Sequence, residues 1–312
     1  DHRPVTGQIV VLAGGTGGAK LARGMLDVVG ADRLSVVANT GDDVEIYGAY
    51  VSPDPDLISF WLADRIDDRG WGLEGDTFNV MDGLRELGVD VWFNLGDRDL
   101  ALGIERARAL NGGARLTEAH AALTTQLGIG ARVLPMSDRP VRTRVLANGT
   151  WWPLQEFMIK ARGEGPVDDV DFRGAAAAGP SPEVAEAIAS ASAIVIGPSN
   201  PIISIGPILE TAGVHEAIVS SAAPVVAVSP LVGGRVLKGP TAVFMEWAGH
   251  PLSSDGIAAA YEGLIDGLIA DERTGALPTL EIDVALASPD QRRTVAEQTL
   301  LFAQALSAPH RE

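Results

Sequence analysis

The chain has 312 residues, of which 24 are basic and 41 acidic, and its formal net charge is −17 at pH 7. This charge disfavours a nucleic-acid backbone or an anionic membrane surface as a partner, although a small anion can bind where local groups or a metal outweigh the field. Cysteine is absent, which excludes disulfides, thiolate nucleophiles and cysteine metal sites. No apolar run reaches the roughly 18–20 residues of a membrane span. The first residues lead into a strand and do not resemble a signal peptide, so we expect a cytoplasmic protein.

Short apolar runs alternate with helix-like segments in the first part of the chain. Buried strands are predicted at Gln8–Ala13, Leu34–Ala38 and 89–93, because these runs are short, contain β-branched residues and precede glycine or polar residues. Helices are predicted between and after them, at 19–29, 56–66 and 100–110. This alternation is typical of a parallel sheet with helices on both faces.

The middle of the chain interrupts this alternation. Residues 141–146 and 151–159 flank an Asn-Gly pair, Asn148 and Gly149, which is a strong short-range signal for a β-hairpin. Residues 164–180 are expected to form a flexible surface connection. We therefore predict a doubly wound, mostly parallel Rossmann-like α/β sheet, formed by residues 1–134 and 181–312, with a hairpin-containing insertion at 135–180.

The alternation returns in the last part of the chain. Ser181 and Pro182 have the residue types of an N-cap and a first helical residue. A helix starting at Ser254 is expected to reach about residue 270, and Ser288 is expected to cap a final helix to about residue 306. The remaining predicted elements are a helix at 183–191 and strands at 193–196 and 224–228.

A glycine-rich loop, Gly14-Gly15-Thr16-Gly17-Gly18, lies between the first predicted strand and helix. It departs from the dinucleotide fingerprint, which needs glycine at Lys20, and from the phosphate-binding P-loop, which needs glycine before that lysine and a hydroxyl after it. Small residues still allow backbone N–H groups to approach an anion at the positive end of a helix. Tight packing alone is the alternative explanation.

Four carboxylates follow the second predicted strand. Asp42 and Asp43 end the sequence NTGDD, and Asp54 and Asp56 come shortly afterwards. Adjacent loops converge at the carboxyl ends of parallel strands, so the glycine loop and this carboxylate loop should face one crevice. Their oxygens suit a hard cation such as magnesium. Adjacent aspartates point in different directions, so one of Asp42 and Asp43 should reach the metal, and Asp54 or Asp56 can instead be an N-cap.

Two further loops carry polar candidates. Asn94, Asp97 and Arg98 follow the third predicted strand, where Arg98 is either held in a surface ion pair or is a planar donor for a phosphate or carboxylate. Ser199 and Asn200 stand between two prolines after a predicted strand, which fixes the backbone and presents polar side chains to a ligand.

Eight segments in order resemble the 2-phospho-L-lactate transferases of coenzyme F-420 biosynthesis over nearly the whole chain. They are GGTGG at 14–18, NTGDD at 39–43, SPDPD at 52–56, LGDRDL at 95–100, LPMSD at 134–138, LQEF at 154–157, GPSNPIISIGPIL at 197–209 and VSPLVGG at 228–234.

The resemblance implies a transferase that moves a phospholactyl, phosphoenolpyruvyl or phosphoglyceryl group from a guanosine diphosphate-linked donor to the ribityl hydroxyl of the deazaflavin Fo, releasing GMP. It also implies a homodimer. Phosphoryl transfer depends mainly on alignment and charge neutralisation. Magnesium bridging the diphosphate oxygens would allow this acidic protein to bind an anionic donor.

The resemblance also implies residue roles. Asp42 is the expected principal metal ligand with Asp43 as its helper, and Asp54 or Asp56 should orient the attacking hydroxyl and accept its proton. Pro55 departs from the family's usual SPDLDT, which leaves the choice between those two open. The implied substrate-binding residues are Gly14, Gly15, Thr16, Gly17, Gly18, Asn39, Thr40, Asn94, Asp97, Arg98, Ser199 and Asn200. Further candidates are Lys238 for phosphate and Trp92, Phe93, Trp151 and Trp152 for stacking on the deazaflavin.

A second interpretation is a non-catalytic, nucleotide-sugar-binding regulator resembling gluconeogenesis factor, which shares the glycine loop and a second loop similar to NTGDD. The segments LPMSD and LQEF fit the transferase better.

Overall fold

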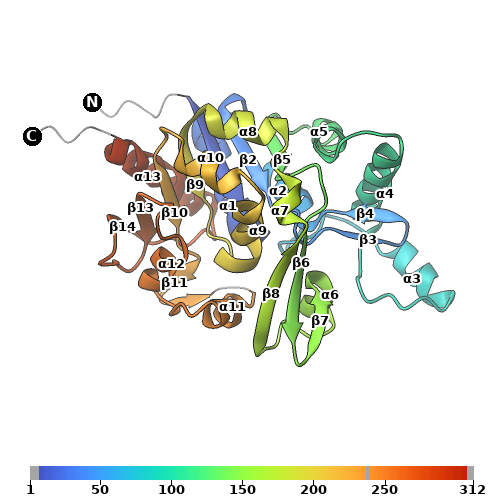
Figure 1. Cartoon of the computed structure of the whole chain (residues 1–312). Coiled ribbons are helices and arrows are strands. Elements are labelled where there is room, and N and C mark those ends of the chain that lie inside the picture. The colour runs from blue at the N-terminus through green and yellow to red at the C-terminus, as the bar shows by residue number, and fades with distance from the viewer. Residues whose placement is uncertain (1–6, 237–238, 308–312) are drawn as a thin grey trace, which may run out of the picture.

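The computed structural model describes residues 7–236 and 239–307, and its centre is a seven-stranded parallel sheet (Figure 1). The strand order is β14-β13-β10-β9-β1-β2-β5. The strands are β1 (Gln8–Ala13), β2 (Leu34–Ala38), β5 (Arg132–Pro135), β9 (Ala191–Ile196), β10 (Val225–Val228), β13 (Gly267–Ala270) and β14 (Thr279–Glu281). The chain builds the sheet outward from β1 to β5 and then resumes on the other side with β9. This confirms the predicted doubly wound α/β fold and puts its topological switch point between β1 and β9.

Helices cover both faces of this sheet. Val11 of β1 belongs to a core shared with α1 (Gly15–Val29), α2 (Pro53–Leu62) and α13 (Pro289–Ser307). Val10 and Leu12 point to the opposite core, which lies under α8 (Pro182–Ala189), α9 (Gly206–Glu210), α10 (Val214–Val219) and α12 (Ser254–Ala260). Strands buried on both faces need apolar residues at consecutive positions, which explains why β1 reads as an unbroken hydrophobic run.

A separate antiparallel sheet lies between β5 and β9 in sequence. It consists of β6 (Arg142–Ala147), β7 (Thr150–Pro153) and β8 (Val167–Arg173), with α6 (Leu154–Ile159) after β7. Asn148 and Gly149 both have positive φ, 51° and 72°, as the two central residues of a type I′ hairpin require. The predicted hairpin is confirmed. The prediction of a mere connection at 164–180 is wrong, because residues 167–173 complete this small sheet as β8.

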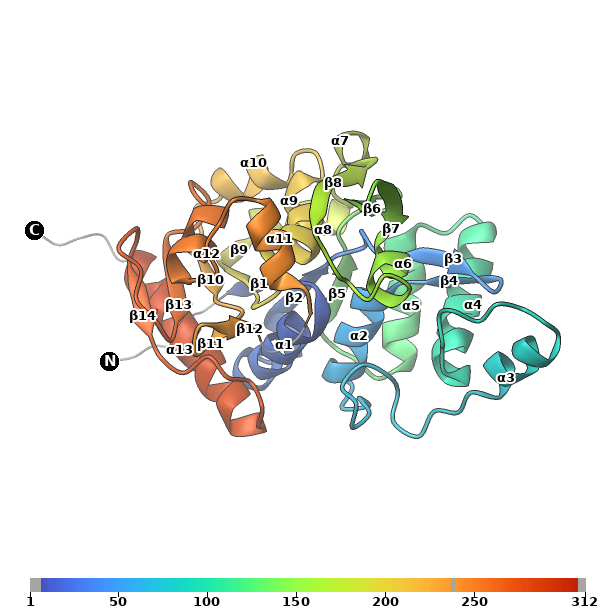
Figure 2. The ribbon, with the colours of Figure 1, turned by 90° about the horizontal axis from the view of Figure 1, so that it is seen from below.

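A second group of elements outside the main sheet lies between β2 and β5 in sequence. It comprises β3 (Val44–Ile46), β4 (Ala49–Val51), α3 (Asn79–Glu86), α4 (Asp97–Asn111) and α5 (Leu116–Gln126). Figure 1 and Figure 2 both show α3 projecting away from the main sheet. The strand predicted at 89–93 is wrong: Val91 and Phe93 pack in a small cluster with Met81 and Leu95, and β5 takes the sheet position beside β2. Val91 and Phe93 are only half-buried there, Val89 is exposed, and the run forms no strand of the described sheet.

Several helix boundaries differ from the sequence predictions by a few residues, and two of these differences affect the glycine loop and the sheet. The first helix already begins at Gly15, so most of the glycine loop forms its first turn. The helix expected to reach residue 270 ends at Ala260, after which Gly263 adopts φ 75° and residues 267–270 pair with β10 as a strand. The cap at Ser181 is confirmed, since its hydroxyl accepts a hydrogen bond from Val184 N at 3.2 Å.

The remaining elements are α7 (Ala175–Ala178), β11 (Leu231–Val232), β12 (Arg235–Val236), α11 (Thr241–Trp247), a 3₁₀ turn (Ala31–Arg33) and a π-helical turn (Pro201–Ile205).

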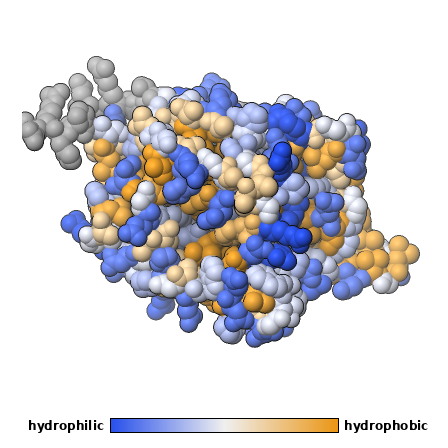
Figure 3. All heavy atoms as spheres, in the orientation of Figure 1, coloured by the Kyte–Doolittle hydropathy of each residue, from blue (hydrophilic) through white to orange (hydrophobic). Residues whose placement is uncertain are grey.

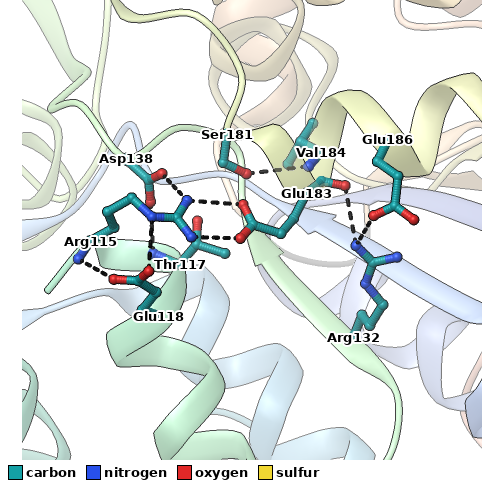
Figure 4. A network of polar contacts seen from close by, with 9 residues as sticks. All are labelled: Arg115, Thr117, Glu118, Arg132, Asp138, Ser181, Glu183, Val184 and Glu186. Carbon is teal, nitrogen blue, oxygen red and sulfur yellow. Dashed lines mark hydrogen bonds and ion pairs between the residues drawn. The ribbon is translucent and has the colours of Figure 1, made fainter.

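One guanidinium joins the two ends of the segment that forms the small antiparallel sheet (Figure 4). Arg115, at the start of α5, donates to Asp138 at 2.9 Å and to Glu183 at 2.6 Å. Asp138 follows β5 and Glu183 lies in the first turn of α8, so the chain leaves and rejoins the main fold at one point. Hydrogen bonding to Arg115 lowers the pKa of Glu183 to about 2.

The surface is mixed in polarity (Figure 3). Hydrophobic side chains gather on the projecting α3 region, where Leu87 is 81% and Val80 44% exposed. Within the two described ranges, no helix combines the length and apolar character needed to cross a membrane.

Candidate active site

The loops that follow β1, β2 and β9 meet at the switch point of the sheet. Ser199, after β9, accepts a hydrogen bond from Gly14 N at 3.2 Å and donates to Gly14 O at 2.6 Å. Asp54 Oδ1, in the first turn of α2, accepts from Gly15 N at 2.7 Å. The structure therefore brings the glycine loop, the Ser199 loop and one of the predicted carboxylates together, where open α/β sheets bind ligands.

The glycines of this loop serve two purposes. A Cβ on Gly17 would lie 2.0 Å from Pro198 O, and one on Gly18 would lie 2.6 Å from Ser199 Oγ, so these glycines are required by the close approach of two loops. Gly15 is different: it has φ 62° and a Cβ there would meet nothing within 4 Å. Packing thus accounts for Gly17 and Gly18, while Gly15 and the half-buried Thr16 stand at the N-terminal end of α1, where an anion is favoured.

Asp42 and Asp54 meet at one amide group. Asn39 Nδ2 donates to Asp42 Oδ1 and to Asp54 Oδ2, both at 2.9 Å, and Asn39 Oδ1 accepts from Gly41 N at 2.7 Å. Burial and the negative charges of Asp54 and Asp43 raise the pKa of Asp42 well above its usual value, and burial raises that of Asp54 to about 6. Neutral amides hold these two carboxylates, so their negative charge is concentrated in the crevice.

Asp43 faces away from this pair. Its Oδ1 accepts from Ser52 Oγ at 2.7 Å, and Tyr50 is a further hydrogen-bond partner of this carboxylate. Burial raises the pKa of Asp43 to about 7, although the nearby Arg142 opposes this shift. The two adjacent aspartates therefore point in different directions, and only Asp42 shares Asn39 with Asp54.

Asp56 is held by a fully buried arginine. Arg106 Nη1 donates to Asp56 Oδ2 at 3.1 Å and to Tyr50 O at 2.9 Å, and Nη2 donates to the other oxygen of Asp56. His120 Nδ1 lies 3.4 Å from Nη2, and His120 Nε2 lies 3.3 Å from Ser59 Oγ. A guanidinium has donors only, so Nδ1 is the acceptor and Nε2 carries the proton. Burial lowers the pKa of His120 well below its usual value, which keeps this ring neutral.

Arg106 is not among the site residues predicted from the sequence. The buried residues of α4 are Leu100, Gly103 and Arg106, spaced by three along one face. Arg106 falls on the same helix face as Leu100 and Gly103, and this spacing could have predicted a buried arginine. A buried arginine needs a buried acidic partner, which would have pointed to an ion pair. The half-buried Gln155 of α6 was also missed, although its Nε2 donates to Asp42 Oδ2 at 3.2 Å. It lies within LQEF, a segment that the resemblance included.

The LGDRDL segment forms the start of α4 next to α3, and Asn94 directly precedes it. Asp97 accepts hydrogen bonds from Thr77 Oγ1 at 2.7 Å and from Val80 N at 2.9 Å, and so fixes the start of α3. Asn94 Oδ1 accepts from Arg85 at 2.7 Å, and Arg98 is exposed in the first turn of α4. The structure does not join these three residues to the Asp42–Asp54 pair through any of these contacts.

Two buried donors near the crevice lack protein partners. Asn200 Oδ1 accepts from Ile202 N and Ile203 N and so starts the π-helical turn, but Asn200 Nδ2 has no partner among the described residues. Thr40 is 1% exposed, and in the same part of the chain its hydroxyl is also unpartnered. Buried polar atoms are normally hydrogen-bonded, so both groups are candidates for contact with a ligand.

The aromatic candidates form two groups, one in the run at 89–93 and one in β7. Trp92 and Phe93 stack on each other with centroids 5.6 Å apart, and Lys160 Nζ lies 4.7 Å from the centre of the Trp92 ring. Trp151 is 39% exposed beside Arg144, while Trp152 packs partly into the small-sheet core. Lys238 lies outside the described residues.

The comparison with known proteins decides the family. A family model described as "2-phospho-L-lactate transferase CofD" matches residues 9–299. The chain belongs to the CofD family. It is similar to a "2-phospho-L-lactate transferase" of Methanosarcina mazei, with 40% identity over 85% of this chain and 87% of the relative. It is also similar to a "Phosphoenolpyruvate transferase" of Streptomyces griseus, with 36% identity over 96% of this chain and 100% of the relative.

This CofD chain is therefore a CofD-type transferase of coenzyme F-420 biosynthesis. Among solved structures, a Bacillus halodurans member of the upf0052 family superposes with a TM-score of 0.61 at 17% identity, covering 95% of this chain and 99% of that one. At this identity the superposition supports the fold alone.

Proposed function

We propose that this CofD chain transfers a phospho-acid group from a guanosine diphosphate-linked three-carbon acid to the ribityl hydroxyl of the deazaflavin Fo and releases GMP. The observation that supports this most is the pairing of Asp42 and Asp54 at Asn39 Nδ2, next to Gly15 at the N-terminal end of α1. A helix N-terminus favours a phosphate, and a carboxylate pair beside it favours a cation bound to that phosphate.

A divalent cation fits this crevice. Asp42 and Asp54 receive only neutral amide and backbone donors, so no side-chain cation offsets their charge in these contacts. Within 7–236 and 239–307, no group of three or more His, Cys, Asp or Glu side chains could hold a metal on its own. Magnesium commonly uses one or two carboxylates together with substrate phosphates and water. When bound, it would neutralise the charge of the diphosphate; we assign Asp42 as its principal ligand.

Asp54 is the better candidate for the residue that handles the attacking hydroxyl. The cationic Arg106 pairs with both oxygens of Asp56, whereas the oxygens of Asp54 accept from the neutral donors Gly15 N and Asn39 Nδ2. We propose that the hydroxyl oxygen of Fo attacks the phosphorus that carries the three-carbon acid. The bond from that phosphorus to the oxygen of GMP breaks, and the hydroxyl proton passes to Asp54. The raised pKa of Asp54, about 6, suits a proton acceptor near neutral pH.

The test is turnover with defined substrates. The protein is incubated with Fo, magnesium and, in separate reactions, the guanosine diphosphate-linked lactyl, enolpyruvyl or glyceryl donor, and GMP is measured by chromatography. We expect GMP with at least one donor, and mass spectrometry of the phosphodiester identifies the preferred acid. Absence of GMP with all three donors, from protein that is folded by circular dichroism, would overturn the proposal. Omitting magnesium tests the cation separately.

We also propose that the protein acts as a homodimer in the cytoplasm. The exposed apolar side chains at α3, including Leu87 and Val80, are a surface that association would remove from water. Light scattering coupled to size-exclusion chromatography measures the mass directly, and a species of about 65 kDa, twice the 32.5 kDa of one chain, is expected. A monomer at all concentrations would contradict this part of the proposal.

A further inference from the structure

The small sheet reaches the acidic loop through two contacts. Thr143 N, in β6, donates to Gly41 O at 2.6 Å, and Gln155 Nε2, in α6, donates to Asp42 Oδ2 at 3.2 Å. Gln155 and Asp42 are 113 residues apart in sequence. A segment outside the main sheet therefore contacts the carboxylate to which we assign the metal.

The packing of α6 fixes the position of Gln155. Phe157 is fully buried and meets Phe244 of α11 edge to face, with centroids 6.0 Å apart and ring planes at 75°. Leu154 is 5% exposed in the same core. With the residues on both sides of it anchored, Gln155 is presented from a rigid support, and its amide is directed at Asp42.

The chemical type of residue 155 matters because of the charge on Asp42. The two oxygens of Asp42 accept hydrogen bonds from the amides of Asn39 and Gln155. A lysine or arginine in place of Gln155 would neutralise Asp42 and compete with a cation. A purely apolar side chain would leave Asp42 Oδ2 without its donor, so that Asn39 alone would hold the carboxylate through Oδ1. An amide orients the carboxylate and leaves its charge available. Residues that hydrogen-bond to a metal ligand without touching the metal affect the affinity for that metal.

We infer that Gln155 is a positioning residue that holds the Asp42 carboxylate in the orientation for binding a divalent cation. The small sheet thereby contributes to the metal site without supplying a ligand. This inference rests on the proposed function, because that function assigns the metal to Asp42.

The test measures metal binding apart from turnover. Gln155→Met keeps approximately the length and volume of the side chain and removes its amide, so the fold should be retained. Binding of Mn²⁺, alone and with GDP, is followed by the electron paramagnetic resonance signal of the free ion. We expect Gln155→Met to bind Mn²⁺ about 10- to 100-fold more weakly than wild type. Gln155→Lys should weaken binding further, because its ammonium pairs with Asp42.

The matched control is Gln126→Met, at the exposed end of α5. It should bind Mn²⁺ like wild type, and all variants should keep the wild-type circular dichroism spectrum. Equal Mn²⁺ affinity of wild type and Gln155→Met would overturn the inference and leave the proposed function intact. If wild type itself bound no Mn²⁺ with or without GDP, both this inference and the metal assignment would fall. In turnover assays, Gln155→Met should need more magnesium for half-maximal rate.

Discussion

Arg106 of α4 and Asp56 of α2 form a two-pronged ion pair in which Arg106 is completely buried and the Asp56 side chain is only 6% exposed. The same guanidinium contacts Tyr50 O and faces His120, so it joins α2, α4, α5 and the backbone of β4. Asp54, two residues before Asp56, faces the crevice. The pair therefore fixes the helical turn that presents a proposed catalytic carboxylate.

Removing Arg106 should strongly destabilise the protein. Arg106→Gln leaves Asp56 as a buried, uncompensated charge, which typically costs about 3–5 kcal/mol of unfolding free energy. Urea unfolding monitored by circular dichroism measures the loss. The control is Arg108→Gln on the same helix, whose ion pair with Glu105 is exposed and whose removal should have no measurable effect. Equal losses for both variants would contradict a special role for the buried pair.

Asp54→Asn and Asp56→Asn should have opposite consequences. Asp54→Asn keeps the shape of the side chain and removes the proton acceptor, so turnover should fall. Its amide NH2 loses one hydrogen bond, from Gly15 N or Asn39 Nδ2, so the urea midpoint should fall less than in Asp56→Asn. Asp56→Asn leaves the buried Arg106 without its anionic partner and should destabilise the fold. Parallel measurement of GMP release and urea midpoint separates the two. If Asp56→Asn alone lost activity while retaining full stability, the assignment of Asp54 would be wrong.

Asp42→Asn should abolish turnover without loss of stability. Asp42 is a half-buried carboxylate near Asp54 and Asp43, and removal of its charge relieves repulsion among them. The melting temperature of this variant should therefore equal or exceed that of wild type while GMP release disappears. The exposed Asp90→Asn is the control and should leave both unchanged. Turnover close to wild type in Asp42→Asn would refute the assignment of this residue to the metal.

Glycine substitutions should separate close packing from backbone conformation. Gly17→Ala places a Cβ 2.0 Å from the backbone oxygen of Pro198, so the two loops must move apart and stability should fall by several kcal/mol, as estimated for overpacking. Gly15→Ala has free space, but its φ of 62° should cost about 1 kcal/mol. Gly83→Ala, within α3 and with nothing within 4 Å, should stabilise by about 0.5–1 kcal/mol. Chemical denaturation provides all three values.

The Arg115–Glu183 contact predicts a pH dependence of stability. The folded pKa of Glu183, about 2, is below the unfolded value of about 4.3, so this group stabilises the fold above the unfolded pKa. That contribution is lost as the pH falls from about 4.5 toward 2. Wild type should lose unfolding free energy more steeply than Glu183→Gln over this range. Parallel curves for the two proteins would contradict the assigned pKa.

Local rules predicted the features that depend on neighbouring residues. The Asn148-Gly149 hairpin and the Ser181 cap follow from the backbone preferences of those residues alone. The run at 89–93 has the composition of a buried strand, but its place was decided by packing against Met81 and Leu95. The contacts of Arg106 with Asp56 and of Gln155 with Asp42 join distant segments. No local pattern could specify which carboxylate each would meet.

Arg115 binds both Asp138 and Glu183. The stretch between these two residues is therefore a unit whose two ends are held close together. Because its entry and exit are already held together, replacing that stretch by the corresponding piece of a relative adds little loop-closure entropy and leaves the strand pairing of the main sheet untouched. Residues of this stretch that face the carboxylates, such as Gln155 beside Asp42, can therefore diversify by exchange of this one unit, while the glycine loop and the carboxylates of the main fold are inherited unchanged.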